Sequence, residues 1–138
     1  MPASRTYTIL IAIGFMFSGC NSRPSYQEAD VFPVSGSVSV DGKPAAGVVI
    51  VFHPQTDTGM TKGNKPFTTS GEDGTFEVTT YTTGDGAPIG EYIVTFIWPE
   101  NPRGPSQDRL KGRYAKPELS QITVTVQEGE NQLPNWNL

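Results

Sequence analysis

The sequence predicts an all-β domain, an antiparallel β-sandwich of seven strands. Three observations lead to this prediction. The chain of 138 residues holds 15 glycines and 12 prolines, which favour turns. Several short segments alternate apolar and polar residues with a period of two, as half-buried strands do. No window of ten residues shows a convincing apolar period of 3.6, so helices are not expected.

The first two expected strands flank a turn. In 34–40, "VSGSVSV", valines and a glycine occupy one face and serines the other, which indicates a half-buried strand. The segment 41–47 begins Asp-Gly and then has a proline, which is turn chemistry. The segment 48–54, "VVIVFHP", is apolar on both faces, so a central strand is predicted there.

Two shorter strands should follow a polar loop at 55–66. The first is 67–70, "FTTS", and a "GEDG" turn then leads into 75–81. In that second segment Phe76 and Val78 should point inward, and the polar residues between them outward.

The strongest strand pattern is 91–98, "EYIVTFIW". One face collects most of its large side chains, namely Tyr92, Val94, Phe96 and Trp98. The segments 121–127 and 132–138 complete the expected set, and Pro134 should confine the last strand to a sheet edge. Strands at such short intervals are typical of an immunoglobulin-like sandwich, although the Cys…Trp…Cys pattern of true immunoglobulin domains is missing.

A different pattern precedes the strands. Residues 7–17 carry no charge and follow Arg5, yet they are fewer than the roughly 20 residues that a membrane-spanning helix needs. Their length fits the apolar region of a signal peptide, about 7–15 residues. The small residues Ser18 and Gly19 follow this region, and then comes Cys20, the one cysteine of the chain.

The stretch Phe17-Ser18-Gly19-Cys20 resembles the lipobox of bacterial lipoproteins. That resemblance implies cleavage before Cys20, lipidation of its thiol and an extracytoplasmic, membrane-anchored location in the cell envelope. An ordinary signal peptide with a chance cysteine is the alternative. The expected organisation is a lipoprotein signal peptide at 1–19, a lipid-anchored tether at 20–33 and the sandwich domain at 34–138. Part of the tether, around Val31–Phe32, could pack on the domain.

Within the domain, the stretches "VSGSVSVDGKPAAGVVIVFHP", "TSGEDGTFEVTTY" and "GAPIGEYIVTF" resemble the carboxypeptidase regulatory-like domain, a sandwich related to the transthyretin fold. The matching positions include Asp41-Gly42, Asp73-Gly74 and Gly90-Glu91-Tyr92. Ala46 stands where the family pattern has a larger apolar residue. The resemblance implies a non-catalytic accessory domain linked to adhesion, carbohydrate contact or assembly.

The charge of the chain excludes one class of partner. After residue 19 the sequence holds nine basic and fourteen acidic residues, a formal charge of −5. Nucleic-acid binding needs a basic face, so no nucleic-acid partner is expected.

The sequence offers little for catalysis. His53 is the one histidine, and no metalloprotease, nucleophile-elbow or P-loop pattern occurs. The Asp-Gly pairs at Asp41, Asp73 and Asp85 lack calcium-loop spacing and are predicted to serve turns, with Asp41 and Asp73 capping theirs through their side chains. We therefore expect no enzyme activity, no metal and no cofactor.

The most unusual segment is the long loop 99–120, with five basic and three acidic residues. Its formal charge is +2, which leaves −7 for the rest of the chain after residue 19. A loop of this length is often functional. The candidate partner-contact residues are Arg109, Lys111, Arg113, Tyr114 and, on another connection, Tyr81. The alternative is a solvated connection pinned by Leu110 and Tyr114.

Two functions remain open from the sequence. The first is a binding or structural module of the cell envelope, held to the membrane through lipid on Cys20 and contacting an envelope protein or glycan. The second is a carbohydrate-binding module for envelope or extracellular glycans. Aromatic residues could form a sugar platform, and the candidates are Tyr81, Trp98, Tyr114 and Trp136. By the alternation pattern, Trp98 and Trp136 are more expected in the core.

Overall fold

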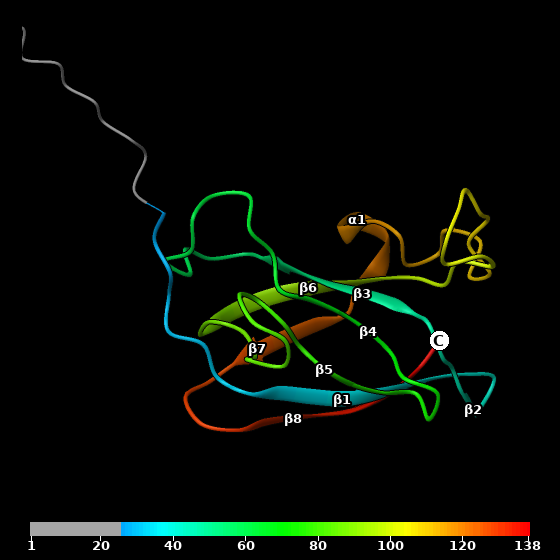
Figure 1. The fold of residues 1–138 in the computed structure, drawn as a ribbon, viewed down its shortest axis with the longest axis horizontal. Coiled ribbons are helices and arrows are strands. Elements are labelled where there is room, and N and C mark those ends of the chain that lie inside the picture. Colours follow the sequence, from blue (N-terminus) through cyan, green and yellow to red (C-terminus); the bar gives the residue numbers. More distant parts are fainter. Residues whose placement is uncertain (1–25) are drawn as a thin grey trace, which may run out of the picture.

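The computed structural model describes residues 26–138, so Cys20, the predicted signal peptide and the start of the tether lie outside the described residues. Two β-sheets stack face to face, as Figure 1 shows, and the predicted all-β sandwich is confirmed. The first sheet contains β1 (Val34–Val40), β2 (Lys43–Pro44), β5 (Thr75–Glu77) and β8 (Asn131–Asn137). The second contains β3 (Val49–Pro54), β4 (Phe67–Thr69), β6 (Gly90–Ile97) and β7 (Thr123–Val126).

Two details differ from the prediction of seven antiparallel strands. The described chain has an eighth strand, the two-residue β2, which pairs back onto β1 across the turn at Asp41-Gly42. In addition, β8 runs parallel to β1, because the turn after β7 carries the chain from the second sheet across to the first. A single turn of helix, α1 (Pro117–Ser120), lies within the long loop.

The edge position predicted for the last strand is confirmed. β8 pairs with β1 and with no other strand of the described chain. Its register against β1 shifts between Ser35 and Ser37, opposite the segment that contains Pro134. A proline cannot donate to the ladder, and an edge strand with an irregular register tolerates that loss.

The second sheet is antiparallel throughout, in the order β4-β3-β6-β7. β3 lies between β4 and β6, which confirms its prediction as a central strand. The two sheets also meet at one side, where Phe67 of β4 and Thr79 exchange backbone hydrogen bonds of 2.9 Å in both directions.

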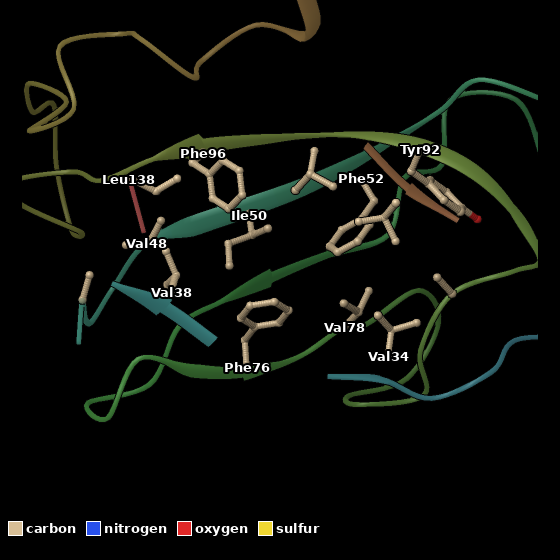
Figure 2. Packing of buried hydrophobic residues seen from close by; sticks show 14 of the residues in the cluster. Val34, Val38, Val48, Ile50, Phe52, Phe76, Val78, Tyr92, Phe96 and Leu138 are labelled. Atoms are coloured by element: carbon tan, nitrogen blue, oxygen red, sulfur yellow. The ribbon is translucent and has the colours of Figure 1, made fainter. Parts of the chain in front are cut away.

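The core lies between the sheets and follows the predicted alternation (Figure 2). Phe76 and Val78 are 4% and 0% exposed, whereas Glu77 between them is exposed. β6 contributes Tyr92, Val94 and Phe96, each 0% exposed. Gly36 also faces this core, because a Cβ there would lie 2.7 Å from the ring of Phe76. Burial of large apolar side chains is the main source of stability for such a chain.

β4 inverts the usual arrangement of polar and apolar residues. Thr68 and Ser70 are 8% and 5% exposed, while Phe67 is 51% exposed. Ser70 is satisfied inside, because its hydroxyl donates to the carbonyl of Ala45 at 2.6 Å and accepts from the amide of Val48 at 2.9 Å. An apolar ring is thereby left on the outside of the sandwich.

The turns use their Asp-Gly pairs in two ways. Asp73 caps its turn, accepting from the amide and the hydroxyl of Thr75 at 3.0 and 2.6 Å. Asp41 caps no amide in the described chain and instead adopts a positive φ of 51°, followed by Gly42 at 76°. Consecutive left-handed residues are what a tight hairpin turn requires. The prediction of side-chain capping is correct for Asp73 and wrong for Asp41.

The two ends of the sandwich carry different segments. Residues 26–33 and the connections 55–66 and 80–89 lie at the end where β1 and β6 begin, and the loop after β6 lies at the other (Figure 1). Within residues 26–138, no helix has the length and apolar character to cross a membrane.

Candidate functional site

The predicted contact residues do not form one site. Arg109, Lys111, Arg113 and Tyr114 lie on the loop after β6, whereas Tyr81 lies at the opposite end. β6 has eight residues, so the two ends are separated by about 26 Å of strand.

The loop after β6 is organised by one carboxylate, that of Asp108. Its Oδ1 accepts hydrogen bonds from the amides of Trp98 and Leu110 at 2.8 and 3.0 Å, and its Oδ2 accepts from Gly112 at 2.9 Å. The amide of Arg109 also donates to the carbonyl of Trp98 at 2.8 Å. These bonds tie the end of β6 at Trp98 to the turn 108–112.

Two side chains attach this loop to the core. Leu110 is 1% exposed and belongs to the buried cluster. The ring of Tyr114 meets that of Phe96 edge to face at 6.1 Å, and its carbonyl accepts from the amide of Phe96 at 2.9 Å. The pinning by Leu110 and Tyr114 that the sequence suggested is therefore present.

Two of the three arginines of the loop 99–120 rest on aromatic rings. The guanidinium carbon of Arg109 lies 4.9 Å from the ring centre of Trp98, and that of Arg113 lies 5.6 Å from the ring of Tyr114. Trp98 is itself held, because its Nε1 donates to the carbonyl of Ala46 at 2.8 Å. Each guanidinium donates one long hydrogen bond to a carbonyl, from Arg109 to Glu100 at 3.5 Å and from Arg113 to Leu110 at 3.4 Å. Its other donors stay available for an anion, while the stacking restricts its conformational freedom.

Lys111 lies between the two stacked arginines in sequence and is exposed. Its φ of 56° is left-handed, and its amide donates to the carbonyl of Asp108 at 2.9 Å, which closes the turn. We call Arg109, Lys111 and Arg113, with the rings of Trp98 and Tyr114, the basic end.

At the opposite end, Tyr81 holds the segment that precedes the sandwich. Its hydroxyl accepts from the amide of Ala29 at 2.8 Å, and its ring meets that of Tyr26 edge to face at 6.2 Å. Phe32 and Ala87 exchange backbone hydrogen bonds of 2.9 and 3.0 Å. We call this docked segment, residues 26–33 with Tyr81, the N-terminal end.

Asp85 shapes the connection that carries Tyr81. Its carboxylate accepts from the amides of Thr80, Tyr81 and Thr82 at 2.7, 2.9 and 2.9 Å. Burial acts to raise the pKa of Asp85, but these backbone bonds outweigh it and lower the pKa below its usual value. The sequence identified this residue as a turn former, and the structure shows how Asp85 fixes the backbone of Tyr81.

His53 is a packed residue of β3. Its Nε2 lies 2.8 Å from the hydroxyl of Thr95 on β6. Burial, with a smaller contribution from Lys65, lowers the pKa of His53 below 6.5. Among residues 26–138, no three His, Cys, Asp or Glu side chains lie together in a way that could hold a metal ion.

The four aromatic residues that the sequence offered for a sugar platform do not lie together at one end of the sandwich. Trp136 packs into the core against Phe76, Phe52 and Phe96. Trp98 and Tyr114 are occupied by arginines, and Tyr81 by the N-terminal segment. Phe67, which sequence reasoning passed over, is the exposed ring of the strands. The sequence holds no signal for it, because the polarity of "FTTS" would place Phe67 inside and Thr68 outside, the reverse of what the structure shows.

No protein-family model matches this chain, and no curated protein matches it either.

Proposed function

We propose that this chain is a non-catalytic, lipid-anchored binding module of the bacterial cell envelope, located outside the cytoplasm. One observation carries the proposal. The N-terminal end fastens the segment that follows Cys20 to one end of the sandwich, while the basic end lies at the other. A domain anchored in this way would present its cationic residues away from the membrane.

The chain length between anchor and domain supports that orientation. Tyr26 follows Cys20 by six residues, which can span no more than about 21 Å. Lipid on Cys20 would therefore keep the N-terminal end near the bilayer. Two or more acyl chains suffice for stable attachment, since each buried CH₂ contributes about 0.8 kcal/mol.

The charge distribution supports an anionic partner. The loop 99–120 has a formal charge of +2 in a chain that is otherwise −7 after residue 19. An anionic glycan or an acidic protein face would be attracted to the basic end and repelled elsewhere. The stacked guanidinium groups of Arg109 and Arg113 suit planar carboxylate or phosphate groups.

The resemblance to carboxypeptidase regulatory-like domains agrees with this role, because that family is mainly accessory and non-catalytic. Membership of the family stays a prediction. The β-sandwich is compatible with it, but a fold alone does not establish a function.

The experiment replaces Arg109, Lys111 and Arg113 with Gln in the full-length chain. Retention on an immobilised polyanion, heparin, is measured at low and moderate salt, followed by crosslinking in cells. A matched control replaces Lys62 and Lys65, the lysines of the connection at the other end, with Gln. A second variant changes Arg109 and Arg113 to Lys, which keeps the positive charge and removes the planar guanidinium group.

The proposal expects the triple variant to lose salt-sensitive retention and its crosslinked partner, while the Lys62 and Lys65 control keeps both. Screening over about 8 Å at physiological salt should weaken binding of the unmodified chain. Loss in the arginine-to-lysine variant would assign the contact to guanidinium geometry. Equal retention of the triple variant and the unmodified chain would show that the loop is only a connection.

A further inference from the structure

A groove of about 820 Å³ lies where the two sheets meet, between β4 and the outward face of β5 and β1. At this junction the backbones of Phe67 and Thr79 exchange two hydrogen bonds, which join the two sheets. This volume falls in the range of small-molecule sites, about 300–1,000 Å³. Its lining combines hydroxyls, one carboxylate, one amide and one exposed ring, and the members used below are Ser35, Phe67, Thr79, Glu77, Gly84 and Gln132.

Three polar side chains cross the floor of the groove in a row. Ser35 of β1 is the register partner of Glu77 on β5 and of Gln132 on β8. Neighbouring strands are about 4.8 Å apart, so the row presents a carboxylate, a hydroxyl and an amide at regular spacing. Within residues 26–138, none of these three side chains makes a hydrogen bond to the protein. Their donors and acceptors are available to a ligand.

The turn after Thr79 supports one side of this row. The amide of Gly84 donates to the hydroxyl of Thr79 at 2.9 Å. A Cβ on Gly84 would lie 3.0 Å from Oε2 of Glu77, and its φ is 74°, so glycine lets the turn approach the carboxylate. Glu77 is thus bordered by backbone on one side and open to the groove on the other.

Phe67 supplies an apolar face to the same groove. Its side chain is 51% exposed, although a Phe ring is normally a residue of the core. No Lys or Arg lines the groove, and Glu77 is its one charged side chain. A ligand that offers an apolar C–H face together with several hydroxyls, and carries no negative charge, has the complementary chemistry.

We infer that this groove binds a neutral glycan, with one sugar ring stacked on Phe67 and its hydroxyls bonded by Glu77, Ser35 and Gln132. A peptide strand is less suited, since the backbone of Phe67 is already hydrogen-bonded to that of Thr79 at this side. The inference rests on the proposed binding role and deepens it, but it does not depend on the basic end.

The test screens the full-length chain in detergent against an array of neutral oligosaccharides, including glucans, mannans, galactans, xylans and β-linked N-acetylglucosamine. Affinity for the best of them is then measured by titration calorimetry. Phe67→Ala should weaken binding at least about tenfold, and Phe67→Trp should retain it, because stacking needs a ring. Glu77→Gln should weaken it several-fold, because it replaces a charged acceptor with a neutral one.

Two matched controls make the outcome decisive. Tyr26→Ala removes a ring that is 57% exposed outside the groove and should leave glycan affinity unchanged. The triple Gln variant of the basic end should also bind the glycan normally. If no neutral oligosaccharide binds, or if Phe67→Ala binds as well as the unmodified chain, the groove is not a glycan site. Salt-sensitive retention on heparin would then still support the proposed function by itself.

Discussion

The ring of Phe76 on β5 stacks on that of Trp136 on β8, with centroids 5.6 Å apart and planes 17° apart. The two strands flank β1 on either side, so this pair spans the inner face of the first sheet. Trp136 also meets Phe96 of the second sheet edge to face at 5.2 Å. The three rings connect both layers of the sandwich.

Replacing Phe76 with Ala should therefore be costly. We expect the free energy of unfolding to fall by about 3–5 kcal/mol, the usual range for a buried Phe. Urea denaturation followed by Trp fluorescence measures this change. The matched control is Phe67→Ala, which removes the same side chain from an exposed site and should cost less than about 1 kcal/mol. Similar losses for both variants would contradict the assigned faces of β4 and β5.

Removing the carboxylate of Asp108 should loosen the basic end without unfolding the sandwich. Asp108→Ala leaves the amides of Trp98, Leu110 and Gly112 without their acceptor, and hydrogen bonds to a charged group contribute about 1.5–3 kcal/mol. Hydrogen exchange of those amides should accelerate while the amides of β3 stay protected. Asp57→Ala, which removes one bond to Gly59 in another loop, is the control. Unchanged exchange in the Asp108 variant would mean that Leu110 and Tyr114 suffice to order the loop.

Acidification should weaken the fold through His53. Burial, followed by the charge of Lys65, holds the pKa of His53 below 6.5 in the folded chain. The unfolded chain therefore binds a proton first, and the free energy of unfolding should decline as the pH falls through 6.5 toward the folded-state pKa. His53→Gln should flatten this part of the profile, as seen by urea titrations at about pH 7.5, 6.5 and 5.5. An identical slope in the variant would assign the pH dependence to other groups.

The anchor prediction concerns Cys20, which lies outside the described residues. Cys20→Ala should leave the chain without lipid and without cleavage at this site. Mass spectrometry and membrane fractionation test both, with Ser22→Ala as a control beyond the cleavage site. A variant that stays in the membrane fraction with an unchanged mature mass would contradict the lipoprotein prediction.

The sequence was sufficient for most of the fold, because the period of two in segments such as 75–78 reports directly which side chains face the core. It could not reveal the parallel pairing of β8 with β1, since strand direction depends on which sheet the chain enters after a turn. It also missed β2, whose two residues carry no periodic pattern.

The candidate sites were only partly visible for a related reason. The basic residues of the loop stand out in the sequence, but their stacking on Trp98 and Tyr114 depends on contacts formed by Asp108 and Leu110. The groove is assembled from four strands and from the connections on both sides of β5, and these segments lie far apart between residues 35 and 133. Its exposed ring, Phe67, violates the rule that apolar residues lie inside. The sequence identified Tyr81 as a candidate contact residue, but it could not show that the Tyr81 hydroxyl accepts a hydrogen bond from the amide of Ala29.

The parallel pairing of β1 and β8 has a mechanical consequence. β1 begins at the N-terminal end, and β8 ends at the other, close to the terminal Leu138. A pull applied between the start of β1 and the end of β8 would load the hydrogen bonds between these strands in shear, all at once, rather than opening them one by one. Pulling single molecules from Cys20 and Leu138 should therefore give one abrupt rupture, and the force needed depends on the unfolding barrier rather than on equilibrium stability. A module in this geometry is suited to hold a load.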